Sequence, residues 1–184
     1  ARLHAPGAKT GNALAPSASH PVDASMIRPA GISPDDGSWE TLTAGQMLET
    51  FNSNGIARIP GYVSDQILAD ATSAGTPEDQ VRFITEQSAA WHRINGFKES
   101  TDGIPEHMKM ALIESLSRKH GNSWKDMIPD LDEQVAASVK VDELRSKGIP
   151  GMTPDESQDL IIEALEKYGP DYKRILSIAN QSAR

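Results

Sequence analysis

Histidines are the side chains in this sequence with the widest chemical range, and their spacing gives them no common site. The five are spread over the chain: His4, His20, His92, His107 and His120. None belongs to a HExxH, HxD or HxxxH pattern, which would place two imidazoles on one face as metal ligands. His92 and His120 fall near the expected C-terminal ends of helices, where imidazole interacts favourably with the helix dipole. We therefore expect structural histidines and no metal site.

Motifs of other common active sites are also missing from the sequence. There is no GxxxxGK[ST], GxGxxG or GxSxG segment to bind phosphate or present a nucleophilic serine. The chain has no cysteine, so disulfides, thiolate metal sites and cysteine nucleophiles are excluded together. The acidic segment 35–40 lacks the ligand spacing and terminal Glu of an EF-hand and is interpreted as a turn. We predict a protein that is not an enzyme, with no catalytic, cofactor-binding or metal-binding residues and no cofactor.

The charge distribution argues against nucleic acid as the main ligand. The formal net charge is −8, and the charges of residues 1–38 cancel, so the excess lies in the remainder of the chain. Phosphate-backbone binding depends on Lys and Arg, so contact with RNA is expected to be secondary at most. A basic group formed by Lys167, Lys173, Arg174 and Arg184 is interpreted as a solvated face. No segment approaches the roughly 20 apolar residues of a membrane-spanning helix.

Composition divides the chain into two parts, an extended arm of residues 1–38 and a helical domain of residues 39–184. The arm is rich in Ala, Pro, Ser and Gly and has neither helical nor strand periodicity. It has too little apolar surface to offset its ordering entropy, so we expect it to be ordered only against a partner. The first residue is Ala, which fits either a processed terminus or a start inside a longer protein.

Start and stop signals predict about eight short helices in an irregular all-α bundle. Thr43 and Gln46 form a capping-box pattern, and Thr-Pro pairs at Thr76 and Thr153 mark two further starts. Ser64 and Ser123 are the expected caps of two more helices, and Gly or Pro separates nearly every pair of elements. The expected helices are 43–54, 64–74, 76–95, 105–120, 123–128, 131–146, 154–168 and 170–184.

Helical periodicity predicts the buried face of several of these helices. The expected inner positions are Val81, Ile84, Ser88 and Trp91 in one helix, Met108, Ala111, Leu112 and Ser115 in the next, and Ile161, Ala164, Leu165 and Tyr168 in a later one.

Residues 110–128 and 160–176 share a pattern that predicts a duplicated helix-turn-helix. Each copy has an aliphatic helix, a Gly stop, a polar helix-start residue and a second helix that opens on an aromatic, Trp124 or Tyr172. The pattern resembles Myb/SANT-like helix pairs and the C-terminal signature of a nucleolar family that assembles the large ribosomal subunit. The resemblance covers about 20 residues per copy and implies that Trp124, Tyr168 and Tyr172 are core aromatics. A compact helix-turn-helix corner without that relationship is the alternative.

Two functions follow as hypotheses. The first is a non-enzymatic accessory subunit of a large assembly, such as a mitochondrial ribosome or respiratory-type complex, anchored to other protein subunits by its arm. Mitochondrial localisation and peripheral membrane association through partners belong to this hypothesis. The second is a SANT/Myb-like module that binds basic protein tails or nucleic acid, with the acidic charge favouring the tails.

Overall fold

The described part of the chain is built entirely from helices and their connections. The computed structural model describes residues 27–33, 35, 37–100 and 103–183. Within them it contains a short 3-10 helix, η2 (Gly37–Thr41), and the α-helices α1 (Ala44–Asn54), α2 (Gly61–Ala71), α3 (Pro77–Glu99), α4 (Glu106–His120), α5 (Trp124–Lys147), α6 (Pro154–Tyr168) and α7 (Tyr172–Ser182). This confirms the predicted all-α class.

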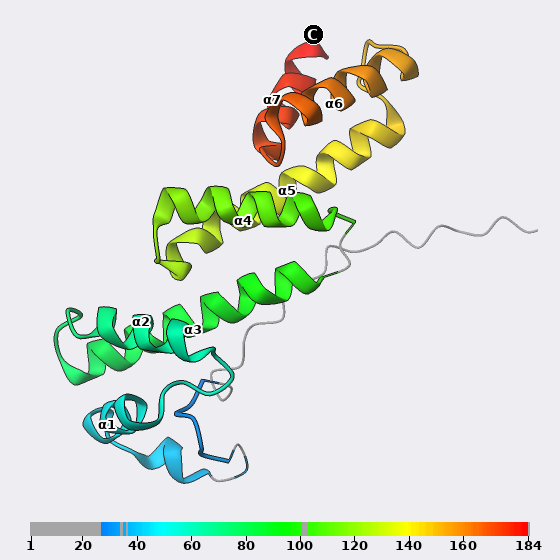
Figure 1. The fold of residues 1–184 in the computed structure, drawn as a ribbon. Coiled ribbons are helices and arrows are strands. Elements are labelled where there is room, and N and C mark those ends of the chain that lie inside the picture. Colours follow the sequence, from blue (N-terminus) through cyan, green and yellow to red (C-terminus); the bar gives the residue numbers. More distant parts are fainter. Residues whose placement is uncertain (1–26, 34, 36, 101–102, 184) are drawn as a thin grey trace, which may run out of the picture.

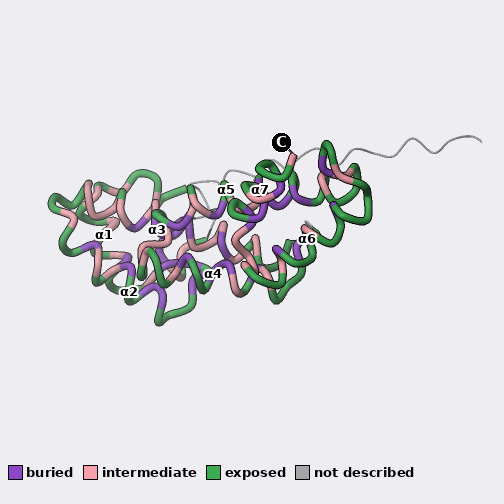
Figure 2. The backbone as a smooth tube through the Cα atoms, turned by 90° about the horizontal axis from the view of Figure 1, so that it is seen from above, coloured by how far each residue is buried: buried purple, intermediate pink, exposed green. Residues whose placement is uncertain are grey.

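The helices form an elongated stack in chain order (Figure 1). α1, α3, α5 and α7 pack in series, each against the next, while α2, α4 and α6 each pack on the helix that follows them in sequence. Buried residues lie where successive helices face one another (Figure 2). The core is accordingly divided into three clusters along the stack, centred on residues such as Phe51, Met127 and Ile161.

The three predicted Thr caps are confirmed. Thr43, Thr76 and Thr153 each accept a hydrogen bond from the backbone N–H three residues ahead, and the side chain of that residue bonds back to the cap. Each box satisfies two backbone N–H groups that have no partner within the helix. The helix starts at these positions are therefore set by local sequence.

The predicted break at Pro129 is wrong, because one continuous helix, α5, runs from Trp124 to Lys147 with Pro129 inside it. An internal proline costs about 3 kcal/mol. Met127 and Leu131, on either side, are 0% and 2% exposed. Burying two such side chains contributes about 3 to 6 kcal/mol, which is enough to offset the loss. The merger of two expected helices leaves seven α-helices among the described residues.

The predicted end of the third helix near Gly96 is also wrong. α3 continues to Glu99, and Ile94 and Phe97 on this last segment pack into the core. A helical glycine costs about 1 kcal/mol relative to alanine, less than these contacts contribute. His92 consequently lies almost two turns inside α3, whereas His120 is the last residue of α4, as expected.

Ser64 is not a helix cap. α2 begins three residues earlier, at Gly61, and Ser64 is buried inside it, where its Oγ accepts the N–H of Ile56 at 2.9 Å. The same contact recurs between Ser157 in α6 and the N–H of Ile149, at 3.0 Å. In both places a serine in one helix satisfies the buried backbone of the connection that leads into it.

The predicted inner faces are right in part. Ile84, Ser88, Leu112, Ile161 and Ala164 are buried as expected. Ser115 is exposed and its neighbour Leu116 is buried instead, while the following side chains are only partly buried: Val81, Trp91, Met108, Ala111, Leu165 and Tyr168.

The described end of the predicted arm packs against the helical body. Ile27 and Arg28 are buried, and Pro29 forms an isolated antiparallel bridge with Ile56. The N–H of Ala57 donates to the carbonyl of Arg28 at 2.9 Å. Residues 1–26 of the arm lie outside the described part of the chain.

Candidate interaction surface

Two buried or half-buried glutamines fix the starts of α5 and α7. Gln87 in α3 accepts the backbone N–H of Lys125 at 3.2 Å and donates to Ser123 Oγ at 3.4 Å. Gln87 therefore supplies a hydrogen-bond partner that the N-terminus of α5 lacks within the helix.

Gln134 in α5 repeats these contacts one step further along the stack. It accepts the N–H of Lys173 at 3.1 Å and donates to Asp171 Oδ1 at 3.1 Å. Ion pairs accompany both sets: Lys125 Nζ lies 2.6 Å from Glu86, and Lys173 pairs with Glu133. The contacts thus recur at an interval of 47 to 48 residues.

A groove of about 710 Å³ opens beside the second of these junctions. One wall is the C-terminal half of α4, the floor is α5, and the other wall is the turn between α6 and α7. Its lining residues are Ala111, Leu112, Ser115, Leu116, Arg118, Lys119, Asp130, Gln134, Tyr168, Pro170, Asp171, Lys173 and Arg174. The volume falls within the range of protein sites that hold small molecules.

Cations outnumber carboxylates along this groove. Its lining contains four Lys or Arg and two Asp residues, although the whole chain has a net charge of −8. Lys119 is engaged by Asp130, with Nζ 2.5 Å from Oδ2, and His120 Nε2 lies 2.8 Å from the same oxygen. The hydrogen bonds from Lys119, and then those from His120, hold the pKa of Asp130 below its usual 3.8.

Tyr168 anchors the other wall. The guanidinium of Arg174 lies over its ring, 4.1 Å from the centroid, and Lys167 Nζ is 5.5 Å from the same centroid. Such cation–π contacts hold a charged group in place without neutralising it. Arg174 therefore presents a positioned guanidinium at the groove.

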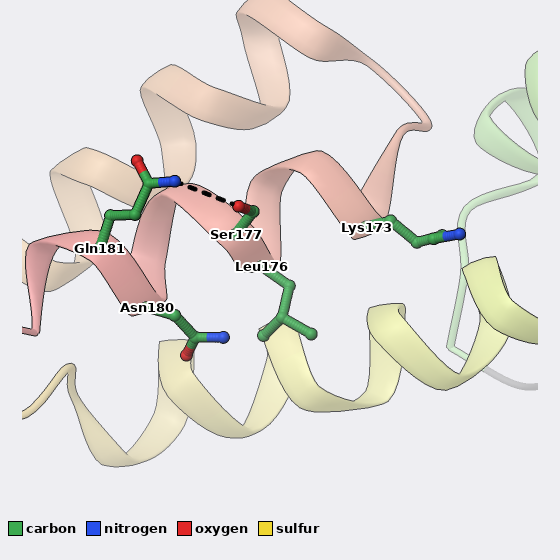
Figure 3. A pocket seen from close by; sticks show the side chains of 5 residues that line it. All are labelled: Lys173, Leu176, Ser177, Asn180 and Gln181. Atoms are coloured by element: carbon green, nitrogen blue, oxygen red, sulfur yellow. Dashed lines mark hydrogen bonds between the residues drawn. The ribbon is translucent and has the colours of Figure 1, made fainter.

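A second, shallower hollow of about 370 Å³ lies on α7, where most of the lining residues are polar types (Figure 3). Lys173, Leu176, Ser177, Asn180 and Gln181 line it, and Gln181 Nε2 donates to Ser177 Oγ at 3.4 Å.

Among the residues that the structure describes, three buried polar atoms have no hydrogen-bond partner: Ser88 Oγ, His92 Nε2 and Trp124 Nε1. Burial lowers the pKa of His92 below its usual 6.5, and the charge of Arg58 lowers it further. The Trp91 ring meets His92 edge-on with a centroid distance of 5.1 Å. The imidazole of His92 is therefore neutral at pH 7 and contributes to packing.

The other residues singled out from the sequence do not all come together in the structure. Of the expected core aromatics, Tyr172 is buried, while Trp124 and Tyr168 are half-buried. Lys173 and Arg174 of the expected basic group line the groove and Lys167 flanks it, whereas Arg184, like His4 and His20, lies outside the described residues. Among the described residues no group of three or more His, Asp or Glu could hold a metal ion.

Sequence reasoning missed the contribution of α4 to the groove, notably Arg118 and Lys119. A signal was present in the basic last turn of the helix, Arg118 to His120, but such residues are also ordinary at helix C-termini. Among the described helices, none is both long and apolar enough to cross a membrane.

Comparison with known proteins adds no relative. No family model, curated protein or solved structure matches the chain.

Proposed function

We propose that the protein is a non-enzymatic accessory subunit of a large mitochondrial assembly, such as a ribosome or a respiratory-type complex. The groove between α4 and the α6–α7 turn is the observation that supports this role. It is an open surface built from three consecutive parts of the stack, so a segment of another subunit can lie along it. Residues 1–38 supply the second attachment, and peripheral membrane association arises through the partners.

The recurrence of the glutamine contacts supports a duplicated helix-turn-helix as the building unit. In both copies a glutamine bridges a Ser or Asp cap and the N–H two residues later, and the first residue of the helix is aromatic. A unit repeated in this way extends a stack while leaving a continuous surface for partners.

A SANT/Myb-like module is the second candidate, because aromatics pack between short helices in those helix pairs and Tyr172 is a buried aromatic here. In that case the protein binds basic tails or nucleic acid. The excess of cations in the groove opposes basic tails at this site, so a tail would have to use another face.

Native purification of the tagged full chain, followed by mass spectrometry, tests the first proposal. We expect a stoichiometric large complex recovered from mitochondria. Deletion of residues 1–26 tests the arm alone, whereas deletion of residues 1–38 also removes the packed Ile27 and Arg28. A free monomer, or a chain that recovers only basic tails or nucleic acid, would refute the subunit role.

A further inference from the structure

The distribution of charge in the groove identifies the chemistry of its occupant. Lys119 and Lys173 already have carboxylate partners, Asp130 and Glu133. Arg174 has no carboxylate partner among the described residues and is held over Tyr168. Arg118 on the opposite wall is 74% exposed and has only a loose contact, 3.7 Å, with Glu114. Two guanidiniums, one on each wall, are therefore available to an anionic ligand.

The fold does not require this basic character. The α4–α5 turn is built like the α6–α7 turn, with Gly121 and Gly169 as equivalent helix ends. Counted from these glycines, His120 and Asp126 occupy the positions of Tyr168 and Arg174. The cation–π pair is thus particular to the second junction, where the groove lies.

Other features of the lining favour a peptide over a polyphosphate. The carboxylates of Asp130 and Asp171 lie among the cations, and Leu112 and Leu116 on the α4 wall are almost fully buried. Phosphate-backbone binding gains affinity from each added cation, and fixed carboxylates in the lining subtract from that gain. A peptide can place separate carboxylates on the two arginines, and its backbone N–H groups can donate to the carboxylates of the lining.

We propose that the groove binds an acidic peptide segment of a partner protein, with Arg118 and Arg174 binding its carboxylates from opposite walls. This proposal rests on the proposed role as a subunit that binds other proteins, and it specifies the chemistry of one partner. Charge complementarity fixes the orientation of the segment, and the bidentate geometry of guanidinium with carboxylate favours arginine for this task.

Selection from a display library of random 12-residue peptides tests the proposal. The native full chain is the target, and the double variant Arg118→Gln/Arg174→Gln is used for counter-selection. We expect enriched peptides with at least two Asp or Glu residues and, by fluorescence anisotropy, a Kd at least tenfold higher for the double variant. Arg82→Gln/Arg145→Gln is the matched control, since it removes the same charge from exposed sites outside the groove; its Kd should change less than twofold.

Any one of four results would overturn the proposal. Three are no enrichment, enrichment of peptides without carboxylates, and equal weakening in the two double variants. The fourth is tighter binding of a 20-nucleotide single-stranded RNA than of every selected peptide. Equal thermal stability of both variants and the native chain serves as the folding check. If the tagged chain still recovers a large complex while the groove takes no acidic peptide, only the groove assignment fails.

Discussion

Replacing Ser157 by alanine tests the buried contact that joins α6 to the connection before it. Ser157 Oγ accepts the N–H of Ile149 at 3.0 Å and donates to the carbonyl of Thr153 at 2.9 Å. Ser157 and Ile149 are 1% and 2% exposed. The substitution leaves the Ile149 N–H buried without a partner, because the surrounding core is apolar.

The expected loss is about 1 to 3 kcal/mol for one unsatisfied buried donor. Alanine regains about 0.5 kcal/mol through its better helix propensity, so the net loss should be about 0.5 to 2.5 kcal/mol. For a chain of this length that corresponds to a decrease in Tm of about 1 to 10 °C. Ser64→Ala should behave alike, because Ser64 makes the equivalent contact with Ile56.

Urea denaturation followed by circular dichroism measures the free energy of unfolding. Ser146→Ala is the matched control, since Ser146 is exposed and bonds only to a carbonyl within its own helix; we expect a change below about 0.5 kcal/mol. Hydrogen exchange at the Ile149 amide should accelerate in Ser157→Ala alone. Equal stability of the Ser157 and Ser146 variants would refute the assigned role of the buried contact.

Four further predictions concern the stack. Gln134→Ala removes two hydrogen bonds at the start of α7 and should cost about 1 to 3 kcal/mol, measured by urea denaturation; no loss would contradict the bridging role. Ile161→Ala, at 0% exposure, should cost about 2 to 5 kcal/mol, and Leu165→Ala, only partly buried, distinctly less; the reverse order would contradict the observed face of α6. Pro129→Ala should raise Tm, because it restores an N–H to the exposed side of α5; an unchanged or lower Tm would contradict this. The pKa of Asp130 in the folded state lies below its usual 3.8, so its ion pairs stabilise the fold above about pH 4 and lose this effect as pH falls through the folded pKa. The Asp130→Asn variant lacks this contribution. In an acid titration its free energy of unfolding should therefore fall less steeply below about pH 4 than that of the native chain, and the two should differ by less than about 1 kcal/mol.

Helix starts were predictable wherever a cap and its partner lie within four residues. The boxes at Thr43, Thr76 and Thr153 need no distant contact, and all three helices begin where the sequence indicates. The glycines that end α4 and α6, at positions 121 and 169, are likewise predictable from local sequence. Errors arose at Ser64 and Pro129, where a local signal for a cap or a break was outweighed by burial against another helix.

Sequence by itself determined the helical class, most helix boundaries and the pairing of a polar cap with an aromatic at Trp124 and Tyr172, since these depend on local hydrogen bonding and periodicity. Tertiary structure alone decided that Gln87 and Gln134 bridge to helix starts almost 40 residues away. It also brought Arg118 of α4 and Arg174 of α7 to the same groove. Contacts between distant segments depend on how successive helices pack, and helical periodicity fixes which face is buried without fixing which helix covers it.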